Sequence, residues 1–129
     1  MVVIDSSVLV RWLTRDDDEL SLRADKIINQ AKAGTFLLDR LILEELSYVL
    51  KGAYHFPRTA VSYNLQSLVQ DDRFVVVDRT MVEDTLKLFG SEKPLSFEDC
   101  WLLMLKQTGR VTTIATFDKA LLKRIDPKA

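Results

Sequence analysis

The chain has 129 residues, of which 47% are hydrophobic and 29% charged, and its formal net charge is −1. This length and composition predict one globular domain over residues 1–129. A net charge so close to zero gives no support for nucleic-acid binding through overall charge. Any such binding must therefore come from local basic patches.

The few cysteine and histidine residues limit the possible metal sites. Cys100 is the single cysteine, which excludes an internal disulfide and is typical of a reducing compartment. With His55 as the one histidine, a zinc site built from Cys and His is excluded. No apolar run approaches the ~20 residues of a membrane helix, and no signal peptide is recognisable. We therefore expect a cytoplasmic protein without a membrane partner, in which oxygen atoms hold any metal.

Apolar runs and helical periodicities alternate along the chain. Strands are predicted at residues 2–4, 35–38, 74–77 and 111–115. Helices are predicted at 8–13, 20–31, 41–50, 57–69, 80–89 and 97–107, and from 118 onward. This order predicts an α/β fold with right-handed crossovers and a parallel sheet that has helices on both faces.

Asp5 follows the first apolar run, residues 2–4. Such a run predicts a central strand that is covered on both faces. Asp5 would then lie at the carboxyl end of a central strand, where α/β folds place their chemistry. The alternative is that Asp5 or Ser6 only caps the following helix, and the sequence leaves both interpretations open.

Three further acids stand at positions that core packing does not explain. Glu45 shares a helical face with apolar residues, where a glutamate is not fully buried unless it is paired, for example with Arg40. Asp99 stands three residues after Ser96, which also resembles a capping box. Asp118 follows the predicted strand 111–115 and is equally a candidate N-cap.

The predicted topology gathers these acids. Right-handed connections bring the strand ends to one side of the sheet. Two carboxylates ~4 Å apart repel by about 4 kcal/mol at an effective dielectric near 20, so a cluster of them calls for a cation. Oxygen ligands favour Mg²⁺ or Mn²⁺, and such a metal suits phosphodiester hydrolysis. We expect one acidic pocket formed by Asp5, Glu45, Asp99 and Asp118.

Four segments of the chain resemble a PIN domain, and specifically the VapC toxins of bacterial and archaeal toxin–antitoxin pairs. They are Val3–Ser7, Glu45–Leu50, Phe97–Asp99 and Thr116–Leu121. The resemblance covers nearly the whole chain. It implies a three-layer α/β/α sandwich with a small parallel sheet of four or five strands. Since the sequence stops at Pro127-Lys128-Ala129, we expect the fifth strand to be short or missing.

The resemblance also implies a Mg²⁺- or Mn²⁺-dependent endoribonuclease. Asp5 and Asp99 would be the principal metal ligands. Glu45 would complete the first site, directly or through water, and Asp118 would hold a second metal or orient the attacking water. Glu98, next to Asp99, is a second acid, and the assignment between the two rests on the motif alone.

Supporting residues and partners follow from the same resemblance. Ser6 and Thr116 would hydrogen-bond to carboxylates or water. Family members are commonly homodimers, and a segment of the cognate VapB-type antitoxin covers the acidic pocket. RNA contacts must come from basic residues near the motifs, or these residues only form solvated helix faces: Arg11, Arg15, Lys119 and Lys123.

Two other functions are alternatives to the nuclease. The first is a non-catalytic interaction module whose acids are helix caps and surface pairs. The second is a phosphoaspartyl phosphohydrolase or receiver domain. A phosphohydrolase of that kind needs Asp-x-Asp after the first strand, where this chain has Asp5-Ser6-Ser7, and a receiver needs an apolar strand that ends in Lys, which is lacking.

Overall fold

Apolar runs of β-branched and aromatic residues form short strands that pair in parallel. The computed structural model describes residues 1–128, and the chain divides into two units, Met1–Arg79 and the part from Thr80 onward. The strands are β1 (Val2–Val3), β2 (Phe36–Leu38) and β3 (Phe74–Val76). All three lie in the first unit, and the expectation of one domain for the whole chain stays a prediction.

Helices fill most of the remaining chain. The first unit contains α1 (Ser6–Thr14), α2 (Asp18–Ile28), α3 (Arg40–Gly52) and α4 (Arg58–Gln70). The second unit contains α6 (Phe97–Gln107) and α7 (Lys119–Ile125). It also contains α5 (Arg79–Ser91), except for the first residue of that helix. Each of the seven predicted helices has a counterpart, although α2 ends at Ile28 and not near residue 31. No helix within residues 1–128 has both the length and the hydropathy that crossing a bilayer requires.

The sheet confirms the predicted α/β class and parallel pairing, but not the number of strands. Its order is β1-β2-β3, with Val2 opposite Phe36 and Phe36 opposite Phe74. Residues 1–128 therefore contain a sheet of three strands, and the prediction of four or five was wrong there. Residues 111–115 form no strand, and most of them are exposed. Since β-propensity expresses the fit to a half-buried pleated surface, it has no effect where that surface is missing.

β1 is an edge strand, which corrects the expectation of a central strand covered on both faces. Val2 and Val3 are 52% and 70% exposed, and only Ile4 beyond the strand is buried. In β2 and β3 burial alternates, so that Phe36 and Phe74 face the core and Val75 is exposed. Within the first unit the sheet is thus covered on one face, and the three-layer arrangement stays a prediction.

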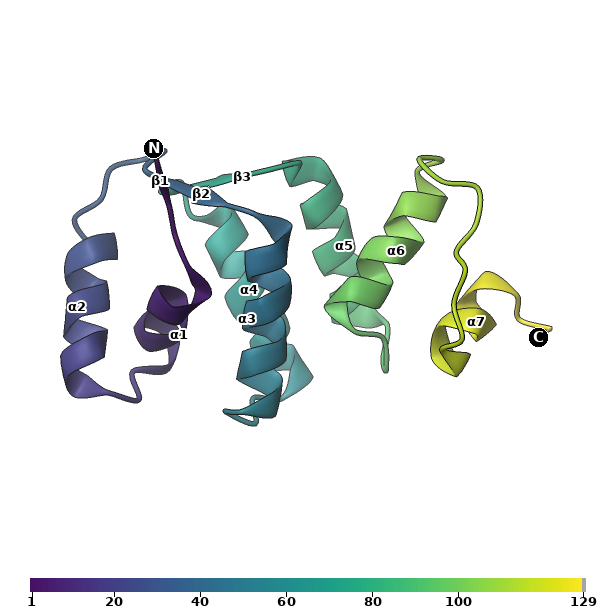
Figure 1. Ribbon diagram of the computed structural model, residues 1–129, viewed down its shortest axis with the longest axis horizontal. Helices are drawn as coiled ribbons and strands as arrows, with labels where there is room; N and C mark the ends of the chain where they lie inside the picture. The colour runs from purple at the N-terminus through teal and green to yellow at the C-terminus, as the bar shows by residue number, and fades with distance from the viewer. Residues whose placement is uncertain (129) are drawn as a thin grey trace. The chain divides into compact units, whose positions relative to one another are not determined.

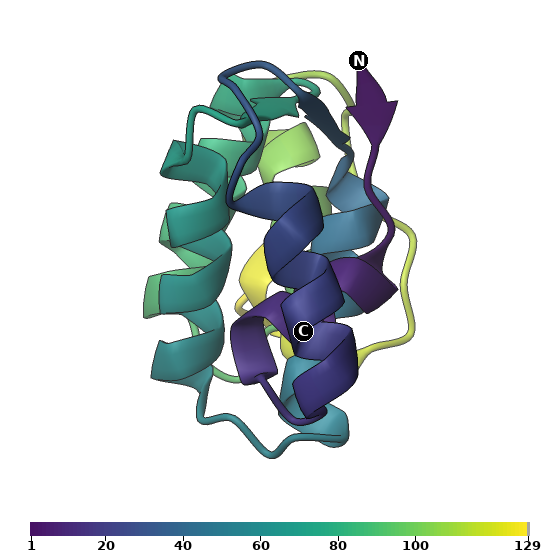
Figure 2. The ribbon, with the colours of Figure 1, turned by 90° about the vertical axis from the view of Figure 1, so that its left-hand side faces the viewer.

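The core of the first unit lies between the sheet and its four helices. Figures 1 and 2 show the short strands at one end of this unit and α1 to α4 running away from them. The Phe36 and Phe74 rings pack with centroids 5.5 Å apart. α3 contributes a fully buried row, Leu43, Leu46 and Leu50, at helical spacing.

The second unit has an apolar cluster of its own. The Phe89 and Phe97 rings meet edge to face, with centroids 6.4 Å apart. Cys100 is a fully buried cysteine on α6 that is in no disulfide bond among the described residues, and Trp101 beside it is 8% exposed. α6 is therefore covered at these positions.

Trp12 on α1 is held by polar contacts at the rim of the first unit. Its indole Nε1 donates a hydrogen bond to the Asn29 side chain over 2.9 Å. The Arg73 guanidinium lies 5.3 Å from the centre of the indole ring, within cation–π range. Arg73 is fixed in turn by an ion pair with Asp71 at 2.6 Å.

Asp16 joins the end of α1 to the loop after α3. Tyr54 Oη donates to Asp16 Oδ2 over 2.5 Å, Arg11 Nη1 donates to the same oxygen over 2.6 Å, and Thr14 Oγ1 donates to Oδ1 over 3.1 Å. These hydrogen bonds, from Tyr54 first and Arg11 second, lower the pKa of Asp16 to about 2. The same contact raises the pKa of Tyr54.

Acid is therefore expected to weaken the first unit through Asp16. Because the folded pKa of Asp16 lies below the 3.8 of an unperturbed aspartate, its carboxylate stabilises the fold above about pH 4 and loses this contribution as the pH falls toward 2. Urea unfolding followed by Trp12 fluorescence should show Asp16→Asn less stable than wild type at pH 7, with a smaller difference at pH 2.5. An equal difference at both pH values would contradict this role.

Candidate functional site

Asp5 is placed by the junction between β1 and α1. It is the N-cap of α1, with extended backbone angles of φ −84° and ψ 151°, and its Oδ2 accepts a hydrogen bond from the Ser7 N–H over 3.0 Å. Hydrogen bonds from the Ser7 side chain and backbone lower the pKa of Asp5. Asp5 therefore caps α1, and its expected role as a metal ligand stays a prediction. The neighbouring hydroxyl that contacts Asp5 is Ser7, whereas Ser6 is buried.

Asp39 repeats this arrangement on the next strand, and sequence reasoning missed it. It follows β2, caps α3 with φ −94° and ψ 152°, and accepts a hydrogen bond from the Leu41 N–H over 2.7 Å. Val3 of β1 pairs with Leu37 of β2. Asp5 stands two residues after Val3 and Asp39 stands two residues after Leu37, so the two aspartates occupy equivalent positions on neighbouring strands. The signal was present in the sequence, because Asp39 also follows an apolar strand and precedes a helix.

Asp99 takes part in a reciprocal cap at the start of α6. The Asp99 N–H donates to Ser96 Oγ over 3.0 Å, and the Ser96 N–H donates to Asp99 Oδ2 over 3.1 Å. This is the predicted capping box, with Asp in place of the usual Glu or Gln. Asp99 is half-buried, whereas Glu98 beside it is exposed.

Asp118 caps α7 and is itself held by Thr116. Its Oδ1 accepts a hydrogen bond from the Leu121 N–H over 2.9 Å, and its own N–H donates to Thr116 Oγ1 over 3.0 Å. Thr116 thus orients the backbone at Asp118 and does not contact the carboxylate in this structure. The candidate N-cap is confirmed here as well.

Glu45 lies on the exposed face of α3. The residues that share its face, Leu41 and Tyr48, are 58% and 82% exposed, so the expectation that they belong to a buried stripe was wrong. Leu43, Leu46 and Leu50 are buried in their place. Arg40 pairs with Glu44, one residue away, at 3.5 Å and not with Glu45.

The helix-start hydrogen bond of each aspartate uses one of its two carboxylate oxygens. Asp5 and Asp99 cap through Oδ2, and Asp118 caps through Oδ1. A carboxylate has about four acceptor sites on its two oxygens, so a cap and a metal ligand are compatible roles. The hard oxygen donors of these side chains are those that Mg²⁺ and Mn²⁺ prefer.

The first unit holds Asp5 and Glu45, and the second holds Asp99 and Asp118. Residues 1–128 contain no group of three or more His, Cys, Asp or Glu side chains arranged to hold a metal ion. Each acid is thus placed and its local partners are known. The assembly of all four into one pocket stays a prediction.

The basic residues near the motifs divide into two kinds. Arg11 pairs with Asp16 at 2.6 Å, and Arg15 pairs with Asp25 at 2.7 Å, so both arginines have structural partners in the first unit. Lys119 and Lys123, on α7, form no such pair among the described residues and line a pocket in the second unit.

A comparison with protein-family models decides the family. The model described as PIN domain matches residues 2–127 and so spans both units. The chain belongs to the PIN domain family. The PIN domain is in general a nuclease fold, and PIN domains generally use divalent metals. Comparisons of this PIN domain with curated proteins and with solved structures gave no significant match.

Substitutions can separate capping from any chemistry of Asp5 and Asp118. Asn caps a helix about as well as Asp, whereas Ala lacks a side-chain acceptor. Asp5→Ala or Asp118→Ala should lower the free energy of unfolding by about 0.5–2 kcal/mol, and the Asn variants should stay close to wild type. Urea denaturation measures both. Equal losses for Ala and Asn would show that the charge, and not the cap, stabilises the helix start.

Proposed function

We propose that this PIN domain is a Mg²⁺- or Mn²⁺-dependent endoribonuclease, the VapC-type toxin of a toxin–antitoxin pair, acting in the cytoplasm. The observation that supports this most is the family match over residues 2–127, because it covers all four acids of the expected site. Carboxylate oxygens, with about four acceptor sites per side chain, are the donors that such a site needs.

The proposed roles follow the motif positions. Asp5 and Asp99 hold the metal, Glu45 completes its coordination directly or through water, and Asp118 holds a second metal or positions the attacking water. The metal, when bound, activates water and offsets the negative charge that develops on the phosphate oxygens. Asp5 is ionised at neutral pH, as a metal ligand must be, and the hydrogen bonds from Ser7 lower its pKa further.

The supporting groups in this proposal are small hydroxyl residues. Ser6 hydrogen-bonds to a carboxylate or to water, and Thr116 fixes the backbone from which Asp118 projects. The proposed partners are the RNA substrate, a VapB-type antitoxin that covers the acids, and a second copy of the chain in a homodimer.

A second candidate function is a non-catalytic interaction module. The observation that favours it is that three of the four acids already serve as helix caps, while residues 1–128 contain no three-residue metal group. This alternative requires no metal, so metal dependence distinguishes the two functions.

Cleavage of RNA tests the nuclease directly. Incubation with total RNA and Mg²⁺ should give defined cut ends, and EDTA should prevent them. Asp5→Asn and Asp99→Asn should each reduce the rate more than ~100-fold, since even outer-shell changes at metal sites cost 10- to 100-fold. The matched control is Asp17→Asn, because Asp17 also caps a helix, α2, but follows no strand. Full activity of either site variant would refute the assignment.

Metal binding can also be measured without activity. A metal that binds only the folded chain stabilises it by about 2.7 kcal/mol at a hundredfold excess over Kd. Mg²⁺ should therefore raise the melting temperature of the wild-type protein, and the rise should be smaller for Glu45→Gln. For Glu44→Gln the rise should equal that of the wild type, since the native Glu44 carboxylate pairs with Arg40. An unchanged melting temperature of wild type at millimolar Mg²⁺ would favour the interaction module.

A further inference from the structure

A basic pocket lies within the second unit, and none of the acids assigned above lines it. It has a volume of about 410 Å³, in the range of small-ligand sites. Its lining comes from the loop before α6 and from α7, chiefly Lys93, Pro94, Leu95, Lys119, Lys123 and Arg124. The lining includes four cationic side chains and no acidic one.

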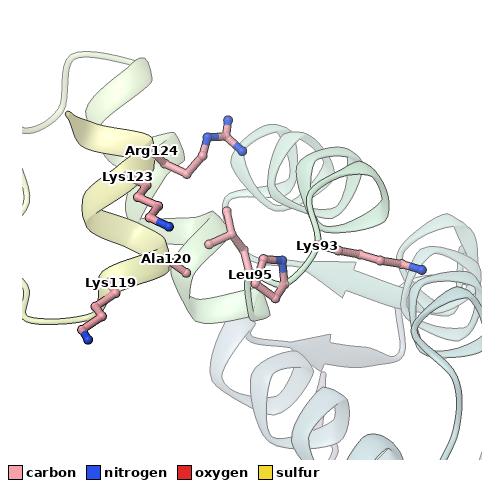
Figure 3. A pocket seen from close by; sticks show the side chains of 7 residues that line it. Lys93, Leu95, Lys119, Ala120, Lys123 and Arg124 are labelled. Atoms are coloured by element: carbon pink, nitrogen blue, oxygen red, sulfur yellow. The ribbon is translucent and has the colours of Figure 1, made fainter. Parts of the chain in front are cut away.

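Most of this positive charge is not neutralised. Arg124 forms an ion pair with Glu92. Lys93, Lys119 and Lys123 have no ion-pair partner among residues 1–128 and are exposed. Figure 3 shows the Lys123 amine over the pocket between α7 and Leu95, with Lys93 and Lys119 extending outward on either side. Flexible lysine stems can turn such amines toward one anion.

The remaining surface of the pocket is apolar. Leu95, 1% exposed, and Pro94 and Ala120 provide carbon contacts beneath the amines. Two residues before Lys119 stands Phe117, whose side chain is fully exposed at 101%. An exposed aromatic side chain and a group of lysines that are near it in the sequence form the combination by which proteins bind single-stranded nucleic acids, through base stacking and phosphate contacts.

We propose that this basic pocket and Phe117 bind the single-stranded segment of the RNA next to the cut, with a backbone phosphate among Lys93, Lys119 and Lys123 and a base stacked on Phe117. The identity of the strand as RNA rests on the proposed function. The position of the site rests on the pocket alone. The neighbouring Asp118 assigns the pocket to nucleotides adjacent to the phosphate that is attacked.

Binding is measured without metal, so that it does not depend on cleavage. Fluorescence anisotropy in EDTA uses a labelled 12-nucleotide single-stranded RNA, and separate arms use single-stranded DNA of the same sequence, an RNA duplex and inorganic phosphate as competitor. The triple variant Lys93→Gln, Lys119→Gln, Lys123→Gln should bind at least tenfold more weakly. Its slope of log affinity against log salt should fall by about 0.7, the contribution of one phosphate contact to a single strand.

Matched controls exclude a loss of charge or fold as the cause. A second triple variant, Lys26→Gln, Lys32→Gln, Lys87→Gln, removes the same charge from exposed lysines elsewhere and should bind as wild type does. Phe117→Ala should weaken binding about 5- to 100-fold, as removal of a stacking base contact does, and Phe117→Leu should not restore it. Circular dichroism checks that every variant is folded.

The outcomes separate this proposal from the nuclease proposal. If wild type cleaves RNA but the pocket variant binds RNA unchanged, the pocket proposal is refuted and the nuclease stands. If wild type never cleaves but loses RNA affinity with the pocket lysines, the pocket proposal stands and the nuclease fails. Equal weakening by the control lysines, or tighter binding of duplex than of single-stranded RNA, would overturn the pocket proposal.

Discussion

Helix N-termini that begin directly after strands govern the candidate site. The first backbone N–H groups of a helix have no partner within it, and a side-chain oxygen must meet them. At β1–α1 and β2–α3 the chain passes from strand to helix through one aspartate, with nearly the same backbone angles at Asp5 and Asp39. The cap therefore fixes where each carboxylate stands before any ligand is considered.

Under the proposed function, capping and metal binding would share the same residues. A cap needs one carboxylate oxygen and holds the side chain in one rotamer, which leaves the second oxygen pointing in a defined direction. A flexible surface carboxylate would lose more conformational entropy on binding a metal. Thr116 and Ser96 extend the same principle, because each hydrogen-bonds to the backbone N–H of an acid, Asp118 or Asp99. The ordered acids of a PIN domain thus arise from ordinary helix chemistry.

The elements that the sequence predicted well are those with a local cause. Helix starts at Asp5, Ser96 and Asp118 follow from capping, and β2 and β3 follow from short apolar runs. The failures have non-local causes. β1 became an edge strand and residues 111–115 became irregular because strand identity depends on a neighbour that the local sequence does not specify. The face of α3 was misassigned because Leu41 and Tyr48, although apolar, are exposed. Local rules placed each acid, but its relation to the others depends on the same long-range pairing.

The positions of the two tryptophans make each unit of the chain optically distinct. Trp12 reports on the first unit, beside the cation of Arg73, and Trp101 reports on the second from an almost fully covered place on α6. An indole next to a guanidinium and an indole in an apolar interior emit at different wavelengths. Spectra of single-tryptophan chains would therefore show whether the halves melt together or one after the other, which is a direct measure of their thermodynamic coupling.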